Sequence, residues 1–249
     1  MNTEKTFAII DTETLGGVSH AHCPAYHCAG IAFTKSAEVS RINIVIIGNL
    51  LLDTAFYGKF KKDYYRDLLR DPATVICYNE EEAKEIFSAW LNSNNVDCAC
   101  AHNSGFDFNK TFVAECIEGL EFIDTWQAFF ETIGKYRKYN KFCCENGFVT
   151  KSGNIQMTAE VCYRFITGEI EFIEEHTALA DSEIELEILK MCVYKGAEIG
   201  VAYKTCQSIV RNQVKVLTID HKGKQIELEY QNRRNYKDKQ GQVNRIVLK

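Results

Sequence analysis

The chain has 249 residues, 46% of them hydrophobic, and a formal net charge of −5 at pH 7. This length is enough to bury a substantial core, as one large domain or as one domain with an appendage. The apolar runs are too short to cross a bilayer and the N-terminus lacks the layout of a signal peptide, so we expect a cytoplasmic protein. The eleven cysteines have no regular spacing, which favours reduced, buried thiols over a disulfide scaffold.

Positive charge is concentrated at the C-terminal end of the chain. Residues 204–249 carry eleven Lys and Arg against four Asp and Glu, a balance of +7, whereas residues 1–203 carry 18 basic and 30 acidic residues, a balance of −12. Such a split favours a basic arm that meets a polyanion, although simple solvation also accounts for a basic tail. We therefore expect a main domain at 1–200 and a basic, β-rich extension at 201–249.

The order of the predicted elements indicates the fold class. In chain order we predict strands at 7–10, 27–34 and 39–48, a helix at 79–94, a strand at 96–102, helices at 106–120, 123–134, 157–168 and 177–194, a hairpin over 213–231 that turns near Lys222–Gly223, and a strand within 243–248. Strands followed by a mixture of strands and helices are typical of an α/β fold in which helices cover a mixed sheet.

Four carboxylates lie where a core does not favour charge. Asp11 and Glu13 end the first strand on one face, because side chains alternate along a strand, although a strand that runs out into water explains this pair as well. Asp107 lies where a predicted strand ends and a helix begins. Asp181 shares the apolar face of the last long helix, just after His176 and a candidate N-cap at Thr177.

If these four acids converge at one end of the sheet, they require divalent cations. Open α/β folds bind their ligands at the ends of sheet strands. Ligation by oxygen atoms alone favours Mg²⁺ or Mn²⁺ over zinc.

Three stretches resemble, in order and spacing, the motifs of the DEDDh exonucleases: IIDTET (9–14), AHNSGFDFNK (101–110) and HTALAD (176–181). This DnaQ-like family belongs to the ribonuclease-H-like superfamily and includes proofreading subunits of DNA polymerases, ribonuclease T and oligoribonuclease. IDTW (123–126) is similar to the Asp-Thr that the family carries after its second motif. The resemblance covers about residues 5–195 and implies a mixed five-stranded sheet flanked by helices, with the extension outside it.

The resemblance also implies a function and a site. It implies a 3′-to-5′ exonuclease that releases nucleoside 5′-monophosphates from single-stranded ends; relatives act on DNA or RNA, and we slightly favour DNA. Of two Mg²⁺ or Mn²⁺ ions, Asp11 would bridge both, Glu13 and Asp181 would hold the one that activates water, and Asp107 would support the other. His176 would take the proton from the water. The positions that match contacts to the terminal nucleotide are Thr14, Leu15 and Asn103.

Two other functions compete with this interpretation. A binding module on the same fold would dock nucleic acid or a polymerase without cutting. Loss of one acid or of the histidine would mark such a module, and all five residues are present in this sequence. A zinc-dependent adaptor is suggested by SHAHCPAYHC (19–28), which contains His20, His22, Cys23, His27 and Cys28. Because no clean second pair of ligands follows, we favour a loop bordering the active site.

Further segments have a predicted role without a motif. KYRKYNKF (135–142) and, more weakly, KFKKDYYRDLLR (59–70) interleave bases with aromatics as single-strand contacts do. We slightly favour a solvated helix with two inward tyrosines for the first stretch, and more strongly a structural role for the second. Cys98 and Cys100 share a strand face and are predicted to lie in the core. For the extension, contact with nucleic acid, docking on a polymerase and self-association all stay open.

Overall fold

The computed structural model describes residues 5–15, 22–52 and 61–196, and the backbone of four strands between residues 215 and 244. Its contacts divide the chain into two units, Met1–Ala202 and Tyr203–Lys249. Among the described residues, no helix combines the length and the apolar character needed to cross a membrane. The cytoplasmic location stays a prediction.

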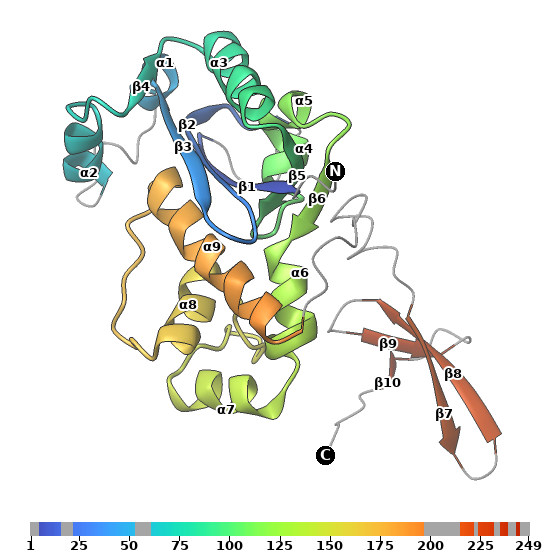
Figure 1. Ribbon diagram of the computed structural model, residues 1–249. Coiled ribbons are helices and arrows are strands. Elements are labelled where there is room, and N and C mark those ends of the chain that lie inside the picture. Colours follow the sequence, from blue (N-terminus) through green and yellow to red (C-terminus); the bar gives the residue numbers. More distant parts are fainter. Residues whose placement is uncertain are drawn as a thin grey trace. The chain divides into compact units, whose positions relative to one another are not determined.

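A six-stranded mixed sheet lies at the centre of the described part of the first unit (Figure 1). Across the sheet, the strand order is β4-β3-β2-β1-β5-β6. The first three strands pair antiparallel as a meander, whereas β4, β5 and β6 run parallel to the strands they join. The strands are β1 (Thr6–Thr14), β2 (Ala25–Phe33), β3 (Glu38–Ile46), β4 (Val75–Cys77), β5 (Val96–Ala101) and β6 (Glu121–Asp124).

The predicted α/β fold, in which helices cover a mixed sheet, is confirmed. The sheet has six strands, one more than the five that the resemblance implies, because β4 pairs with the outer edge of β3. Neither β4 nor β6 is among the strands predicted along the chain, since three or four residues are too few to show a periodicity.

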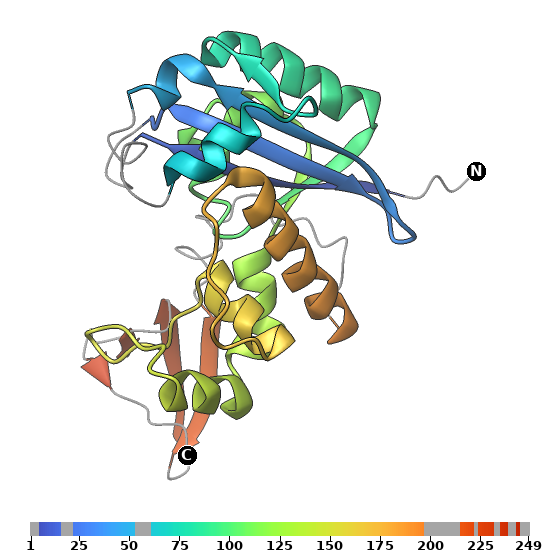
Figure 2. The same cartoon turned by 90° about the vertical axis from the view of Figure 1, so that its left-hand side faces the viewer.

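Helices cover both faces of the sheet. Figure 2 shows α3 on one face and α9 on the other, and α9 packs on β1 and β2. The described helices are α1 (Ile47–Leu50), α2 (Lys61–Leu68), α3 (Glu80–Ser93), α4 (Asp107–Lys110), α5 (Val113–Cys116), α6 (Thr125–Phe129), the π-helix η2 (Phe130–Gly134), α7 (Arg137–Glu145), α8 (Ala159–Thr167) and α9 (Ala178–Tyr194).

Helix α3 follows directly from its sequence. The side chain of Asn79 caps it by accepting the backbone N–H of Glu82 at 3.0 Å, and three glutamates in the first turn favour the positive end of the helix dipole. Its apolar face buries Ala83, Phe87 and Leu91. The helix predicted at 79–94 is confirmed.

Two predicted helix boundaries are wrong. The helix predicted at 106–120 is divided into α4 and α5 because Thr111 has an extended backbone and its hydroxyl donates to the Asp107 carbonyl at 2.7 Å. The helix predicted from residue 123 begins two residues later. Asp124 ends β6 and caps α6 by accepting the N–H of Trp126 at 2.9 Å.

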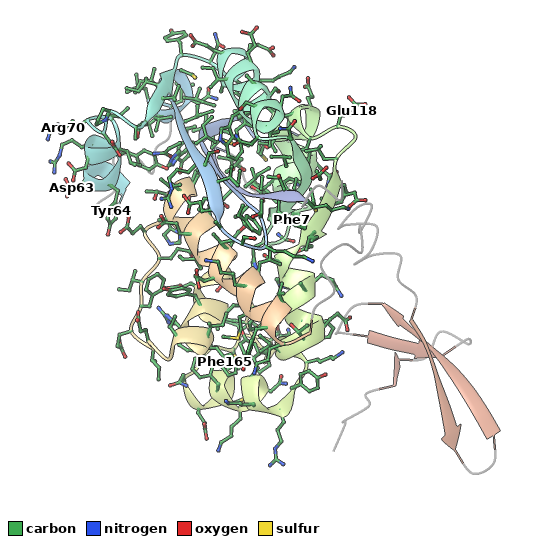
Figure 3. All side chains as sticks on the ribbon, in the orientation of Figure 1. Phe7, Asp63, Tyr64, Arg70, Glu118 and Phe165 are labelled. Carbon is green, nitrogen blue, oxygen red and sulfur yellow. The ribbon has the colours of Figure 1, made fainter. Side chains whose placement is uncertain are left out.

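Alternate residues of β1 enter two different cores. Ala8 and Ile10 pack in the core that contains α3, whereas Phe7 and Ile9 pack in the core that contains α9. A third core joins α6, η2, α7 and α8 to the other side of α9, with Phe165 among these helices in Figure 3. Helix α9 therefore lies between the sheet and the helical layer. Cys98 and Cys100 are buried on the α9 side, which confirms their predicted place in the core.

The second unit contains a four-stranded antiparallel sheet in the order β10-β9-β8-β7. Its strands are β7 (Lys215–His221), β8 (Lys224–Gln231), β9 (Asn235–Asp238) and β10 (Val243–Asn244). His221 pairs with Lys224, which confirms the predicted hairpin. Residues 222 and 223, where its turn is predicted, lie outside the described residues. The basic side chains of the extension lie outside the described residues, so its role stays a prediction.

Gly30 of β2 provides a test of the packing between the sheet and α3. A Cβ atom at this position would lie 2.7 Å from Cη2 of Trp90, and the Trp90 indole is held by its hydrogen bond to Ser40 Oγ at 2.9 Å. We expect Gly30→Ala to lower the free energy of unfolding by about 1 to 3 kcal/mol through overpacking, as measured by urea denaturation. The cost should shrink in a Trp90→Phe background, and an equal cost there would contradict the steric explanation.

Candidate active site

The four predicted carboxylates come from three elements that meet at the C-terminal end of β1. Asp11 and Glu13 lie on β1, Asp107 begins α4 shortly after β5, and Asp181 lies in the first turn of α9. Since β5 pairs with β1 and α9 packs on it, both later acids are brought to this strand. Asp107 and Asp181 are buried, whereas Asp11 and Glu13 are half-buried.

Thr12 joins the first motif to the second. Its hydroxyl donates a hydrogen bond to Asp107 Oδ1 at 2.5 Å, and both side chains are buried. Because Thr12 alternates with its neighbours on β1, it points to the face opposite the one that Asp11 and Glu13 occupy. The acids of β1 and the acid of α4 are thereby held at fixed positions around one strand end.

Burial and mutual repulsion disfavour ionisation of this group. Burial raises the pKa of Asp11 well above its usual value, and the charges of Asp107, Glu185, Asp181 and Glu13 add to the increase. Burial also raises the pKa of Asp107 to about 7, although the hydrogen bond from Thr12 opposes the change. Such a group is ionised together only when positive charge is supplied.

Three of the five motif residues form a group of the size that a metal ion requires. One ligand atom from each of Glu13, His176 and Asp181 lies within 4.8 Å of the others. The Tyr26 hydroxyl donates to Glu13 Oε2 at 3.1 Å and fixes this carboxylate from β2. The donor set fits a divalent cation, because two carboxylates provide the negative charge and the oxygen ligands that such an ion requires.

His176 and Asn103 have unusual backbone conformations. Their φ angles are 55° and 64°, in the left-handed region that residues other than glycine rarely adopt. His176 lies two residues before α9 and belongs to the group with Glu13 and Asp181, whereas Asn103 follows β5, four residues before Asp107. Such conformations persist only where the surrounding structure enforces them, and they occur preferentially at functional sites.

His27 anchors the N-terminus of α9 to the sheet. Its buried imidazole accepts the backbone N–H of Ala178 through Nδ1 at 3.1 Å, and the Tyr65 hydroxyl lies 3.0 Å from the same atom. The proton is therefore on Nε2, which donates to Asn43 Oδ1 at 2.6 Å. Thr177 takes the predicted N-cap position but makes no side-chain cap bond among the described residues, so His27 takes this role.

The histidines and cysteines of 19–28 do not form a zinc site among the residues that the structure covers. Both ring nitrogens of His27 are engaged, and His22 pairs with Glu80 at 3.1 Å. Cys23 and Cys28 are buried as apolar groups. His20 falls in 16–21, outside the described residues. The structure thus gives His27 a structural role and does not favour the zinc interpretation.

The residues predicted to contact the terminal nucleotide differ in their surroundings. Thr14 ends β1 and is half-buried, and Asn103 is exposed while its N–H donates to Asp124 Oδ1 at 3.0 Å. Leu15 packs beside the core around Tyr26, and its N–H donates to the Pro24 carbonyl at 2.8 Å. Their contacts with a nucleotide stay a prediction.

Sequence reasoning missed a further buried acid near this site, Glu185. It is 3% exposed, and its Oε2 accepts the backbone N–H of His102 at 3.0 Å. Burial, followed by the charges of Asp107 and Asp181, raises its pKa well above the usual value. Its position four residues after Asp181 places it on the same helix face, which was a signal available in the sequence.

The two basic and aromatic stretches form helices α7 and α2. Of the two tyrosines in the first stretch, Tyr139 is buried in α7, whereas Tyr136 precedes the helix and is 54% exposed, beside the exposed Arg137 and Lys138. In α2, Tyr65 is buried, and Figure 3 shows Tyr64 pointing outward. The first stretch therefore packs one tyrosine inward rather than two. Contact with nucleic acid stays a prediction for both, and residues 59 and 60 lie outside the described part.

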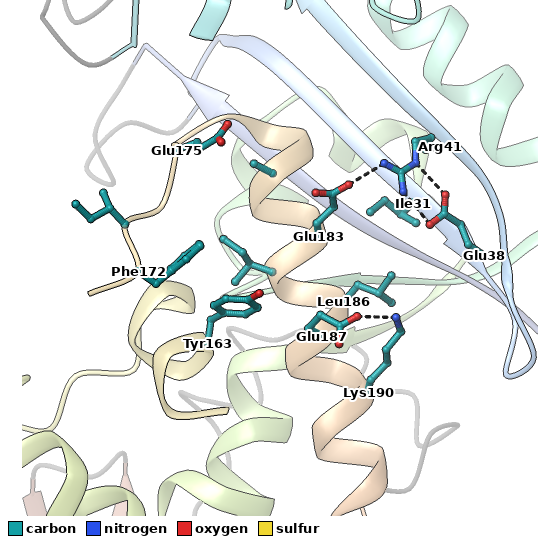
Figure 4. A pocket seen from close by; sticks show the side chains of 13 residues that line it. Ile31, Glu38, Arg41, Tyr163, Phe172, Glu175, Glu183, Leu186, Glu187 and Lys190 are labelled. Atoms are coloured by element: carbon teal, nitrogen blue, oxygen red, sulfur yellow. Dashed lines mark hydrogen bonds and ion pairs between the residues drawn. The ribbon is translucent and has the colours of Figure 1, made fainter. Parts of the chain in front are cut away.

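A cavity of about 380 Å³ lies beside the exposed face of α9 (Figure 4). It is separate from the four motif carboxylates at the end of β1. Arg41 crosses it between Glu38 and Glu183, and Lys190 pairs with Glu187. None of the five motif residues is among the residues that line it.

Comparison with known proteins gives only distant similarities. No protein-family model and no curated protein sequence matches the chain. Among solved structures, exonuclease X in complex with 5′ overhanging duplex DNA has a TM-score of 0.41 and 13% identity, over 81% of this chain and 98% of that one. Cell-death related nuclease 4 has a TM-score of 0.40 and 16% identity, over 78% of this chain and 65% of that one. Similarity this distant identifies no function.

The raised pKa of Asp107 makes the stability of the metal-free protein depend on pH. Its carboxyl holds a proton in the folded state up to its pKa of about 7, but in the unfolded chain it loses the proton near the ordinary pKa of 3.8. The retained proton therefore contributes to the free energy of unfolding in full below about pH 4. This contribution, on the order of 4 kcal/mol, is lost as the pH rises through about 7. In chelator, we expect Asp107→Asn to gain stability over the wild type as the pH rises through this window. Thermal unfolding at several pH values measures this difference, and a constant difference would contradict it.

Proposed function

We propose that this protein is a metal-dependent 3′-to-5′ exonuclease that releases nucleoside 5′-monophosphates from single-stranded nucleic acid, with DNA slightly favoured over RNA. The observation that supports this proposal is the meeting of Asp11, Glu13, Asp107, His176 and Asp181 at the C-terminal end of β1. These five residues come from three separate motifs and three separate elements. A binding module has no need for buried acids that repel one another.

The donor set supports Mg²⁺ or Mn²⁺ as the cofactor, because carboxylate oxygens are the ligands that these hard cations prefer. Two bound ions would activate a water molecule and stabilise the leaving oxygen of an in-line displacement at phosphorus. Glu13 and Asp181 would hold the ion nearer His176, and Asp107 would hold the other. Asp11 would be the ligand shared by both ions, because the charges of all three of these acids raise its pKa.

His176 would move the proton. Its side chain is exposed, so water reaches it, and it lies within the group formed with Glu13 and Asp181. It would take a proton as the water oxygen attacks phosphorus. The bond to the 3′ oxygen of the preceding nucleotide then breaks, which leaves a shortened strand with a 3′ hydroxyl and a free 5′-monophosphate. An imidazole suits this role because it titrates near neutral pH.

The extension would contribute contacts to the substrate rather than chemistry. Its balance of +7 complements a phosphate backbone, whereas the remaining residues carry a balance of −12. Docking on a polymerase or self-association through the same strands is the competing role, and a change of mass in solution after truncation would favour self-association.

The proposal is tested with 5′-labelled DNA and RNA oligonucleotides in Mg²⁺, Mn²⁺ or chelator. We expect a ladder of products that shorten from the 3′ end in either metal and intact substrate in chelator. Intact substrate in both metals would favour the binding module, and full cleavage in excess chelator would exclude a metal-dependent reaction.

Substitution of Asp11 tests the shared carboxylate. We expect Asp11→Asn to abolish detectable cleavage while leaving the protein folded, because it removes the ligand common to both ions. Glu187→Gln is a matched control, since Glu187 is exposed on the outer face of α9 and pairs with Lys190. Cleavage near the wild-type rate by Asp11→Asn would contradict the assignment.

Substitution of His176 tests the proton transfer. We expect His176→Ala to lower kcat by roughly two to four orders of magnitude, the usual share of general acid–base catalysis. Its affinity for Mn²⁺, measured by calorimetry, should stay close to that of the wild type. A large loss of Mn²⁺ affinity would instead identify His176 as a metal ligand, which its distance from Glu13 and Asp181 also permits.

A further inference from the structure

We infer that Glu174 is a positioning residue that holds the His176 imidazole through Nδ1 and leaves Nε2 to accept the proton. This inference rests on the proposed function. It concerns a residue outside the three motifs, in the segment between α8 and α9.

The contact is direct. Glu174 Oε2 lies 3.5 Å from His176 Nδ1, and the two side chains differ in burial, at 12% exposed for Glu174 and 56% for His176. Asp181 lies close enough to Glu174 to affect the pKa of its carboxyl group. One enclosed carboxyl group therefore contacts the residue that would move the proton and lies near the last acid of the motifs.

The backbone directs neighbouring side chains to opposite sides. Glu175 lines the cavity beside α9, as Figure 4 shows, whereas Glu174 and His176 contact each other. Glu174 and His176 lie two residues apart in a segment without regular secondary structure, and the backbone of His176 is in the left-handed region. Two adjacent glutamates thus have different surroundings, which provides a matched pair for comparison.

The segment that carries this pair is anchored at both ends. On one side, Arg164 Nε of α8 donates to the Phe172 carbonyl at 2.7 Å, and the Phe172 ring packs on Tyr163. On the other, His27 accepts the N–H of Ala178. Glu174 and His176 are therefore presented from a fixed frame rather than from a free loop.

The chemistry explains what the contact does. A neutral imidazole carries one proton, and a carboxylate beside Nδ1 favours the tautomer that has its proton there. The lone pair is then on Nε2, where it can accept a proton from water. The same carboxylate stabilises the positive charge that the ring acquires. Groups that orient a functional histidine in this way typically change activity by about 10- to 100-fold when they are removed.

The experiment compares Glu174→Gln with Glu175→Gln in the full chain. With a short oligonucleotide and Mn²⁺, we expect Glu174→Gln to lower kcat by about 10- to 100-fold, with KM, Mn²⁺ affinity and melting temperature close to those of the wild type. Glu175→Gln should leave all four quantities unchanged. In a His176→Ala background, Glu174→Gln should have no further effect on kcat, because its action passes through the imidazole.

A spectroscopic measurement tests the tautomer without any cleavage. In metal-free protein, at a pH where the His176 ring is neutral, ¹⁵N NMR should show the ring proton on Nδ1 in the wild type. In Glu174→Gln, a larger share of the ring proton should be found on Nε2. If Glu174→Gln does not fold, Glu174→Ala takes its place in both measurements.

A wild-type kcat in Glu174→Gln would overturn the inference, and so would an equal loss of kcat when Glu174→Gln is added to His176→Ala. An unchanged His176 tautomer in Glu174→Gln would also overturn it, as would a loss of Mn²⁺ affinity that identifies Glu174 as a metal ligand. Failure of the proposed function is distinguishable, because the wild type would then leave the oligonucleotide intact in every metal.

Discussion

Repulsion between buried carboxylates at the C-terminal end of β1 is the constraint on which the rest of the structure depends. Asp11, Asp107 and Glu185 all have pKa values raised by burial and by the charges of neighbouring acids. An arrangement of this kind lowers stability unless cations bind or protons are retained. The fold must therefore supply enough apolar burial elsewhere to hold these acids together, and the three cores around β1 and α9 provide it.

Positions within the site are fixed by contacts that cross between elements. Thr12 holds Asp107, the N–H of His102 holds Glu185, and His27 holds the first turn of α9. Each bond joins residues distant in the sequence, from 83 to 151 positions apart. Because α9 packs on the sheet with one face and on the helical layer with the other, Asp181 cannot move away from the other acids without disturbing two cores. The site is consequently preorganised by packing, as a catalytic centre requires.

Local sequence patterns predicted much of this arrangement. The remainder could not be predicted, and the reasons are physical. Alternation along β1 placed Asp11 and Glu13 on one face, and helical spacing placed Asp181 on the buried face of α9. The same spacing contained the signal for Glu185, which was overlooked. By contrast, β4 is too short to show a period, and the extended residue Thr111 divides a helix whose apolar pattern continues through it. The role of His27 depends on a contact with Ala178, and that of Glu174 on an irregular segment, so neither leaves a pattern in the sequence.

The central claim is that the buried acids form a site for divalent cations. Calorimetric titration of Mn²⁺ into the protein without nucleic acid, repeated in buffers of different ionisation enthalpy, tests it most directly. At about pH 6, below the pKa of about 7 for Asp107, the account predicts binding of two ions with release of protons as the carboxyls ionise. Binding without proton release, or no binding beyond that of an Asp11→Asn variant, would contradict it.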